Sequence, residues 1–110
     1  REAFKDDLDE KREDLNPDII INAVCKYFSV SKSDIVGKKK NKEIVEPRMI
    51  AIYLICEMLD IPLVVIGKTF GGRDHTTIIH ARDKITEQLK ENGKIKSFVT
   101  AVKEILNENN

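Results

Sequence analysis

Five polar residues that could carry out chemistry stand close together between positions 74 and 80. Asp74, His75, Thr76 and Thr77 follow a Gly-Gly-Arg turn, and His80 stands one helical turn beyond Thr76. An aspartate at the start of a helix accepts hydrogen bonds from the first-turn amides, here those of Thr76 and Thr77. The helix dipole and the outward-pointing amides attract a phosphate, and the short side chains can reach base edges. The segment therefore indicates a helix tip suited to contact with a nucleic acid.

Metal binding and catalysis fit the same residues less well. His75 and His80 are five residues apart, which places them about 140° apart around a helix, so they cannot share one metal ion. Thr76 or Thr77 beside His75 could act as a nucleophile only with an orienting acid, and Asp74 is better used as the helix cap. The sequence predicts no metal site and no catalytic residue.

A second pattern, Gly67-Lys68-Thr69, resembles the end of a phosphate-binding P-loop. That motif requires a glycine five residues before its last glycine, and Pro62 stands at this position. The intervening residues, Leu63 to Ile66, are apolar and are typical of a helix. Nucleotide binding by this chain is therefore not expected.

The 110 residues carry 19 basic and 19 acidic side chains, so the net charge gives no argument for a nucleic-acid partner. The distribution is uneven, because residues 38–48 hold five basic and two acidic side chains and residues 68–84 hold four basic and two acidic ones. A basic patch is typical of a phosphate-binding face. The run of three lysines at 38–40 could equally be solvated surface.

The elements that position these residues are predicted from apolar residues spaced three and four apart. A charged linker helix is expected in residues 1–15, followed by one domain over residues 16–110. Helices are expected over residues 17–28, 46–59, 62–70, 74–90 and 95–106, with a short turn at 32–37 and a basic loop at 38–43. The predicted fold is all-α, a compact helical domain of about six helices that contains a helix-turn-helix, whose tight turn uses Gly71 and Gly72.

The helix over residues 46–59 opens with Pro47 and is apolar nearly all round, so we expect it to be the central, most buried element. Cys25 and Cys56 stand among apolar neighbours and form no CxxC motif, which favours reduced, buried thiols. The longest apolar stretch, Met49 to Cys56, is far too short to cross a membrane. The chain begins with Arg1, so we expect it to be a piece of a longer polypeptide.

The segment Gly71 to Ile85, GGRDHTTIIHARDKI, closely resembles the hallmark of the bacterial chromosomal replication initiator family, DnaA. The resemblance continues upstream through the Gly-Lys-Lys-Lys at 37–40, Pro47-Arg48 and the Ile-Gly-Lys-Thr-Phe at 66–70. It covers about residues 17–106, which correspond to the C-terminal DNA-binding domain of the family. The resemblance implies that this chain binds double-stranded DNA.

The resemblance also assigns roles to individual residues. Base contacts are implied for Asp74, His75 and Thr76 in the major groove and for Lys40 in the adjacent minor groove. Backbone contacts are implied for six further residues: Arg48, Leu63, Val64, Thr77, His80 and Lys84. Arg73 could contact DNA or pair within the protein.

The expected target is a short, asymmetric, A/T-rich origin box similar to TTATNCACA, read during the initiation of chromosomal replication and possibly in transcriptional regulation. The alternative hypothesis is a protein-interaction module that docks a replication regulator through the same face. A third hypothesis is a transcription regulator with a related helix-turn-helix. No cofactor is expected in this chain, whereas ATP and magnesium are implied for the parent protein. The resemblance implies a cytoplasmic, nucleoid-associated protein, possible regulatory partners, no membrane insertion and a monomeric state for this piece.

The sequence departs from the common pattern of the family at several positions. The basic loop uses lysine where arginine is frequent, and lysine inserts less readily into a narrow minor groove. Met49 stands where a polar glutamine is usual, Val64 where proline is frequent, and Cys56 where some relatives have a basic residue. These departures suggest weaker non-specific attraction to DNA with an unchanged helix tip.

Overall fold

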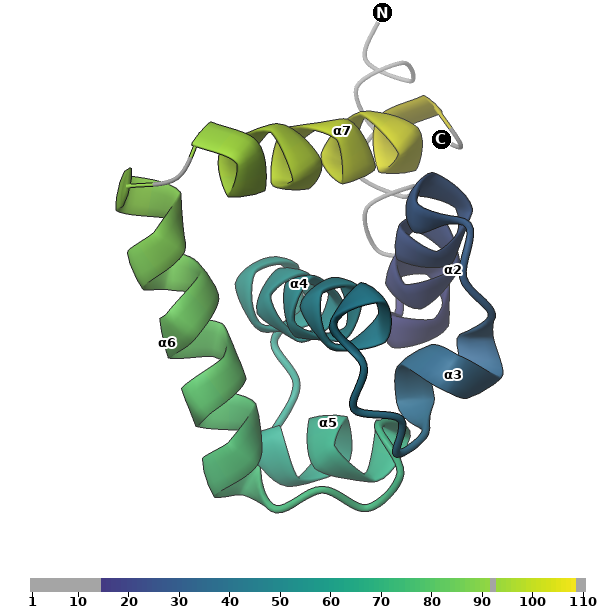
Figure 1. The fold of residues 1–110 in the computed structure, drawn as a ribbon. Helices are drawn as coiled ribbons and strands as arrows, with labels where there is room; N and C mark the ends of the chain where they lie inside the picture. Colours follow the sequence, from purple (N-terminus) through teal and green to yellow (C-terminus); the bar gives the residue numbers. More distant parts are fainter. Residues whose placement is uncertain (1–14, 92, 109–110) are drawn as a thin grey trace, which may run out of the picture.

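The computed structural model describes residues 15–91 and 93–108, and within these ranges every regular element is a helix (Figure 1). The helices are α2 (Pro17–Phe28), α3 (Lys32–Val36), α4 (Lys42–Met58), α5 (Leu63–Thr69), α6 (His75–Glu91) and α7 (Gly93–Glu108). The predicted all-α class with about six helices is confirmed. The linker helix expected in residues 1–15 lies almost wholly outside the described residues.

Helix α4 is the centre of the domain, as its nearly continuous apolar sequence predicts. It packs against α2, α3, α5 and α6, while α7 lies across one end and contacts α2 and α6 (Figure 1). Ile50, Ala51, Leu54 and Ile55 on α4 have no exposed surface. Each fully buried isoleucine or leucine contributes roughly 1.5–3 kcal/mol relative to an exposed one, so α4 anchors the elements around it.

The first described helix begins where the sequence places it. The Asn16 side chain accepts a hydrogen bond from the Ile19 amide at 3.0 Å, and Pro17 occupies the first helical position. Proline is favoured there because its missing N–H has no partner in a helix. At the other end, Ser29 adopts a left-handed conformation with φ of 58°, and its amide donates to Cys25.

The prediction of a short turn at residues 32–37 is wrong, because residues 32–36 form the helix α3 and Gly37 is its C-cap. The Ser31 hydroxyl accepts a hydrogen bond from the Asp34 amide at 3.2 Å and caps the helix. Ile35 is fully buried and packs into the core. This one buried side chain and the serine cap hold a helix that is too short to show a periodic apolar pattern.

The start predicted for the helix over residues 46–59 is also wrong, because α4 begins four residues earlier. Pro47 lies inside α4 instead of opening it, and it is buried. Its missing N–H leaves the Glu43 carbonyl without its usual helical donor. Upstream, the Asn41 carbonyl accepts from the amides of Ile44 and Val45 at 2.9 and 3.0 Å, which closes the first turn. Part of the expected basic loop therefore belongs to the helix.

The helix-turn-helix is formed by α5 and α6 and depends on Gly67. The Gly67 carbonyl accepts from the amides of Gly72 and Arg73 at 3.0 and 2.9 Å, so the turn folds back onto α5. A Cβ atom on Gly67 would lie 2.1 Å from the Arg73 carbonyl oxygen. Gly71 and Gly72 have φ values of 81° and 82°, as a tight glycine turn requires.

The C-terminal part of the molecule differs little from expectation. Helix α6 buries Ile78, Ala81 and Ile85, and Leu89 is half-buried against the core. Helix α7 begins at Gly93, two residues before its predicted start. Its inward face consists of four buried residues: Ile95, Val99, Val102 and Leu106.

The two cysteines are free thiols, as predicted, but each is half-buried rather than buried. Cys25 lies on α2 and Cys56 on α4, and both are partly covered by the core. Burial raises the pKa of both thiols, and nearby Lys32 opposes this effect at Cys25. A raised pKa keeps a thiol protonated and poorly nucleophilic, which agrees with a structural role.

Candidate nucleic-acid interface

The tip of α6 is built by local hydrogen bonds around Asp74. Its carboxylate accepts from the Thr76 amide at 3.3 Å, while the Thr77 amide donates to the Asp74 backbone carbonyl at 3.0 Å. The prediction that the Asp74 side chain caps both amides is therefore confirmed for Thr76 and wrong for Thr77, whose amide bonds to the backbone carbonyl of Asp74. The remaining carboxylate oxygen is left for another donor.

The side chains of the tip face solvent. His75 Nδ1 lies 3.3 Å from the Asp74 carboxylate, and their side chains are 56% and 67% exposed. Thr76 and Thr77 are also exposed, whereas Ile78, the next residue, is fully buried. The helix thus turns its apolar stripe inward and presents an acid, an imidazole and two hydroxyls at one end.

Further along α6, His80 and Lys84 are exposed and continue the polar face. Together with Thr77 they line a pocket of about 240 Å³ between α4 and α6. Its floor and walls are completed by Val45, Arg48, Met49, Ile52, Arg73 and Ala81. Four of the nine lining residues are basic or histidine and none is acidic. Most of the pocket surface is apolar, but a negatively charged group at the pocket would meet no repelling carboxylate.

Arg73, whose role the sequence leaves open, makes a contact within the protein. Its guanidinium donates to the Phe70 carbonyl at 2.5 Å and so braces the turn between α5 and α6. The residue is half-buried and also lines the α4–α6 pocket. Sequence spacing alone could not show that Arg73 lines this pocket, because much of the pocket lining comes from α4, which is far away in the sequence.

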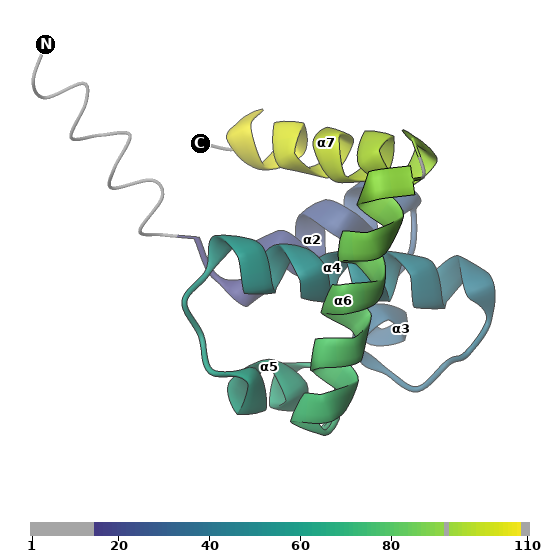
Figure 2. The same ribbon diagram turned by 90° about the vertical axis from the view of Figure 1, so that its left-hand side faces the viewer.

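Leu63 and Val64 are the first two residues of α5, which packs against α6. The first amides of a helix have no carbonyl partner within it, so they are available to an acceptor from outside. Val64 is 55% exposed and Leu63 is half-buried. Figure 2 shows α6 crossing in front of α4, with α5 beside the lower part of α6 on one side and the segment joining α3 to α4 on the other.

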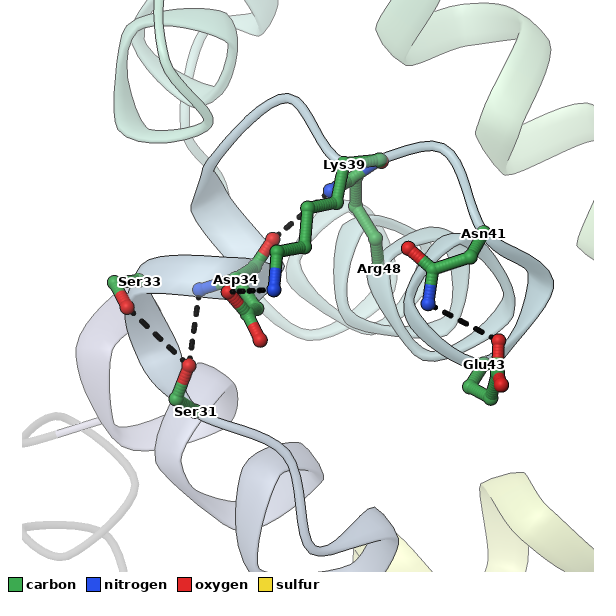
Figure 3. A network of polar contacts seen from close by, with 7 residues as sticks. All are labelled: Ser31, Ser33, Asp34, Lys39, Asn41, Glu43 and Arg48. Carbon is green, nitrogen blue, oxygen red and sulfur yellow. Dashed lines mark hydrogen bonds and ion pairs between the residues drawn. The ribbon is translucent and has the colours of Figure 1, made fainter.

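That joining segment carries the lysines at positions 38–40, which are all exposed. Because α3 ends at Val36 and α4 begins at Lys42, the basic loop predicted at 38–43 is in the structure the segment 37–41, and the name is used for these residues from here on. The Lys39 ammonium lies 3.2 Å from the Asp34 carboxylate, which turns this side chain back toward α3 (Figure 3). Lys40, the residue expected to enter a minor groove, has no ion pair within the described residues.

Arg48 occupies a position that sequence reasoning did not foresee. It is only 5% exposed, and its guanidinium donates to the carbonyls of Ile35 at 2.7 Å, Lys39 at 2.8 Å and Asp34 at 2.9 Å. Burial lowers the pKa of Arg48, the nearby charge of Arg73 lowers it further, and Asp34 opposes both. Three of its five N–H groups are used inside the protein, so the expected phosphate contact has two N–H groups left to it.

Within residues 15–91 and 93–108 no three His, Cys, Asp or Glu side chains gather as a metal site would require. In the same residues no helix combines the length and the apolar character needed to span a membrane.

The fold and the exposed tip define a helix-turn-helix domain with one polar, partly basic face. The family model described as "Bacterial dnaA protein helix-turn-helix" matches residues 17–85. The chain therefore belongs to the bacterial DnaA helix-turn-helix family, a family of DNA-binding domains of replication initiation. The matched part is the DNA-binding domain of these proteins, which is not catalytic.

Individual relatives agree with this assignment. The chain is 47% identical over 92 residues to the chromosomal replication initiator protein DnaA of Thermomicrobium roseum, which covers 84% of this chain and 20% of that protein. It is 44% identical over 107 residues to the protein of the same name from Lactobacillus helveticus, covering 96% of this chain and 24% of the relative. This chain thus spans about a fifth of the length of the relatives it matches.

A solved structure, described as the crystal structure of a DNA replication initiation factor, shares the fold. The superposition has a TM-score of 0.68 at 28% sequence identity, and it covers 98% of this chain and 32% of the other. The helical arrangement described above is therefore found in an experimentally determined relative.

Proposed function

We propose that this chain binds double-stranded DNA in a sequence-specific manner at replication-origin boxes similar to TTATNCACA. The observation that carries the proposal is the exposed tip of α6. Asp74, His75 and Thr76 stand at the positive end of a 17-residue helix, on the side turned away from the core. An α-helix fits the major groove of B-DNA, where side chains at its first turn can reach the base edges.

The tip residues have complementary hydrogen-bonding chemistry. The free oxygen of Asp74 can accept from a cytosine amine, and the Thr76 methyl can contact a thymine methyl. His75 can donate or accept, depending on its tautomer. We assign base contacts in the major groove to these three residues and a base contact in the neighbouring minor groove to Lys40.

The phosphate contacts are assigned to the surfaces beside the tip. The pocket between α4 and α6 has no Asp or Glu in its lining, so a phosphate meets no repelling carboxylate there. Its lining includes Thr77, His80 and Lys84. Leu63 and Val64 would donate from the first amides of α5. Arg48, which also lines this pocket, would add one of its two remaining N–H groups. Phosphate contacts of this kind position a protein on the duplex, and base contacts supply the specificity.

The relatives are named as chromosomal replication initiators, so we place this domain in a cytoplasmic, nucleoid-associated protein acting at an origin. ATP and magnesium would be bound by parts of the relatives that this chain does not cover. The domain itself would act as a monomer with duplex DNA as its partner, and regulatory proteins would be its further partners.

The test compares Thr76→Ala with Thr86→Ala, which removes another exposed threonine from the same helix, far from the tip. Binding to a TTATNCACA duplex and to a scrambled duplex is measured by titration at two salt concentrations. We expect Thr76→Ala to reduce discrimination between the duplexes by roughly 1–3 kcal/mol while non-specific binding is retained. Thr86→Ala should change neither affinity.

An equal loss on both duplexes for Thr76→Ala would remove Thr76 from the reading residues. If the unaltered chain shows no preference for the box duplex over the scrambled one, the proposed function is wrong. In that case the protein-interaction module, docking a replication regulator through the α5–α6 face, becomes the better explanation.

A further inference from the structure

Arg48 joins three consecutive segments of the chain: α3, the basic loop and α4. Its own backbone belongs to α4, and its guanidinium donates to the carbonyls of Asp34 and Ile35 near the end of α3 and of Lys39 in the basic loop. Figure 3 shows Arg48 beside Asp34 and Lys39. All three distances lie between 2.7 and 2.9 Å. Such short, charge-assisted bonds from one planar group fix the relative positions of their acceptors.

At α3 the guanidinium acts as a C-terminal cap. The last carbonyls of a helix lack helical partners and carry the negative end of the dipole, so a cation is favourable there. The Gly37 amide donates to the Asp34 carbonyl at 3.2 Å, and Arg48 supplies the second donor to this oxygen and the only side-chain donor to that of Ile35 among the described contacts.

At the basic loop the same guanidinium holds the peptide immediately before Lys40. Its bond to the Lys39 carbonyl fixes the backbone next to the residue expected to contact the minor groove. The ion pair between Lys39 and Asp34 ties down only an exposed side chain, and surface pairs of this kind contribute little. Three adjacent lysines repel each other, and without the buried arginine the side-chain contacts of the loop are the Lys39–Asp34 ion pair and an exposed hydrogen bond from Asn41 to Glu43.

We propose that Arg48 is a positioning residue for DNA recognition, which holds the basic loop against α3 and α4 and so sets the place from which Lys40 reaches the DNA. This inference rests on the proposed function of Lys40 as a minor-groove contact. It gives Arg48 a task distinct from a phosphate contact. A lysine cannot perform this task. The three carbonyls accept from three different nitrogens of the planar guanidinium, whereas a lysine has only one nitrogen from which to donate.

The experiment is a double-mutant cycle with Arg48→Lys, Lys40→Ala and the combined variant. Two duplexes carry the same box, one with an A/T-rich and one with a G/C-rich flank on the side facing the loop. We expect Lys40→Ala and Arg48→Lys each to lower the preference for the A/T-rich flank by about tenfold. The combined variant should lose no more than either one, because both changes remove the same contact.

Additive losses in the combined variant would overturn the proposal. So would an Arg48→Lys variant that weakens both duplexes equally and keeps the flank preference, since that result describes a phosphate contact only. Arg82→Lys on α6 is the control for replacing an arginine by lysine elsewhere, and it should leave the preference unchanged.

A second measurement keeps the inference testable if Arg48→Lys fails to fold. In the unaltered protein, ¹⁵N relaxation should give backbone order parameters for residues 38–40 close to those of the helices, about 0.85, and not below about 0.6 as in mobile loops. A mobile loop in the unaltered protein overturns the proposal. If the protein binds no box duplex but this loop is rigid, the proposed function has failed while the structural role of Arg48 stands.

Discussion

The tip of α6 and the basic loop are both exposed and both proposed to touch DNA bases, but they are held in place by different means. At the tip, the hydrogen bonds that hold residues 74–77 in place join residues two or three positions apart. At the basic loop, the decisive contacts come from Arg48, which is nine residues from Lys39 and fourteen from Asp34 in sequence. The tip is therefore a local structure, and the loop is a tertiary one.

This difference determines how each region can fail. A helix tip keeps its shape as long as its helix is docked, so changes at the turn that docks α6 affect it most. The loop keeps its shape as long as one buried guanidinium is satisfied, so distant changes in α6 should leave it intact. Substitutions that separate the two regions test this distinction.

The largest effect is expected from Gly67→Ala, which targets the docking of the tip. The added Cβ would lie 2.1 Å from the Arg73 carbonyl oxygen, which belongs to backbone and cannot move aside cheaply. We expect the free energy of unfolding to fall by about 3 kcal/mol, as for severe overpacking. Urea denaturation followed by circular dichroism measures this change.

Gly93→Ala is the matched control, because a Cβ at Gly93 meets no atom within 4 Å. Its unfolding free energy should stay within about 0.5 kcal/mol of the unaltered value. In the folded fraction of Gly67→Ala, amide signals of the basic loop should be retained while those of residues 73–77 shift. Equal disturbance of both regions would contradict the separation between them.

An intermediate effect is expected at Asp74, where one side chain serves both stability and reading. Asp74→Ala removes the hydrogen bond to the Thr76 amide, and loss of such a cap costs about 1 kcal/mol of stability. Asp74→Asn retains an acceptor and should restore most of this stability in thermal denaturation. If the carboxylate also reads a base, the asparagine variant will still bind the box duplex less tightly; full recovery of binding would limit Asp74 to capping.

The smallest effect is expected from Lys39→Ala in the basic loop. It removes the exposed ion pair with Asp34 but leaves the Lys39 carbonyl in place for Arg48. We expect a change in unfolding free energy below about 0.5 kcal/mol, as is usual for surface pairs. A loss approaching that of Asp74→Ala in the same thermal assay would mean that the ion pair, rather than the buried arginine, holds the loop.

Much of this molecule could be predicted from its sequence where neighbours in sequence decide the outcome. The Asn16-Pro17 start of α2, the turn at Gly71 and Gly72, and the inward stripe of α6 follow from caps, positive φ angles and helical spacing. The exposure of the proposed reading residues follows from the same spacing. Their contacts with DNA stay predictions.

The errors lie where distant residues compete with local signals. Pro47 indicates a helix start, yet α4 continues through it because the surrounding helix is buried on several sides. Residues 32–36 have no helical period of their own and still form α3, since Ile35 enters the core. In both places the free energy gained from tertiary burial exceeds the local preference.

The sequence alone determined the helical class, the position of the turn and the chemistry of the helix tip, because backbone sterics and hydrogen bonds to near neighbours are encoded within a few residues. Only the tertiary structure decided that a buried Arg48 ties the basic loop to α3, that Arg73 braces the turn, and that α4 and α6 enclose an acid-free pocket. Each of these depends on side chains brought together by packing of the core, and no spacing along the chain encodes which distant carbonyl a guanidinium will meet.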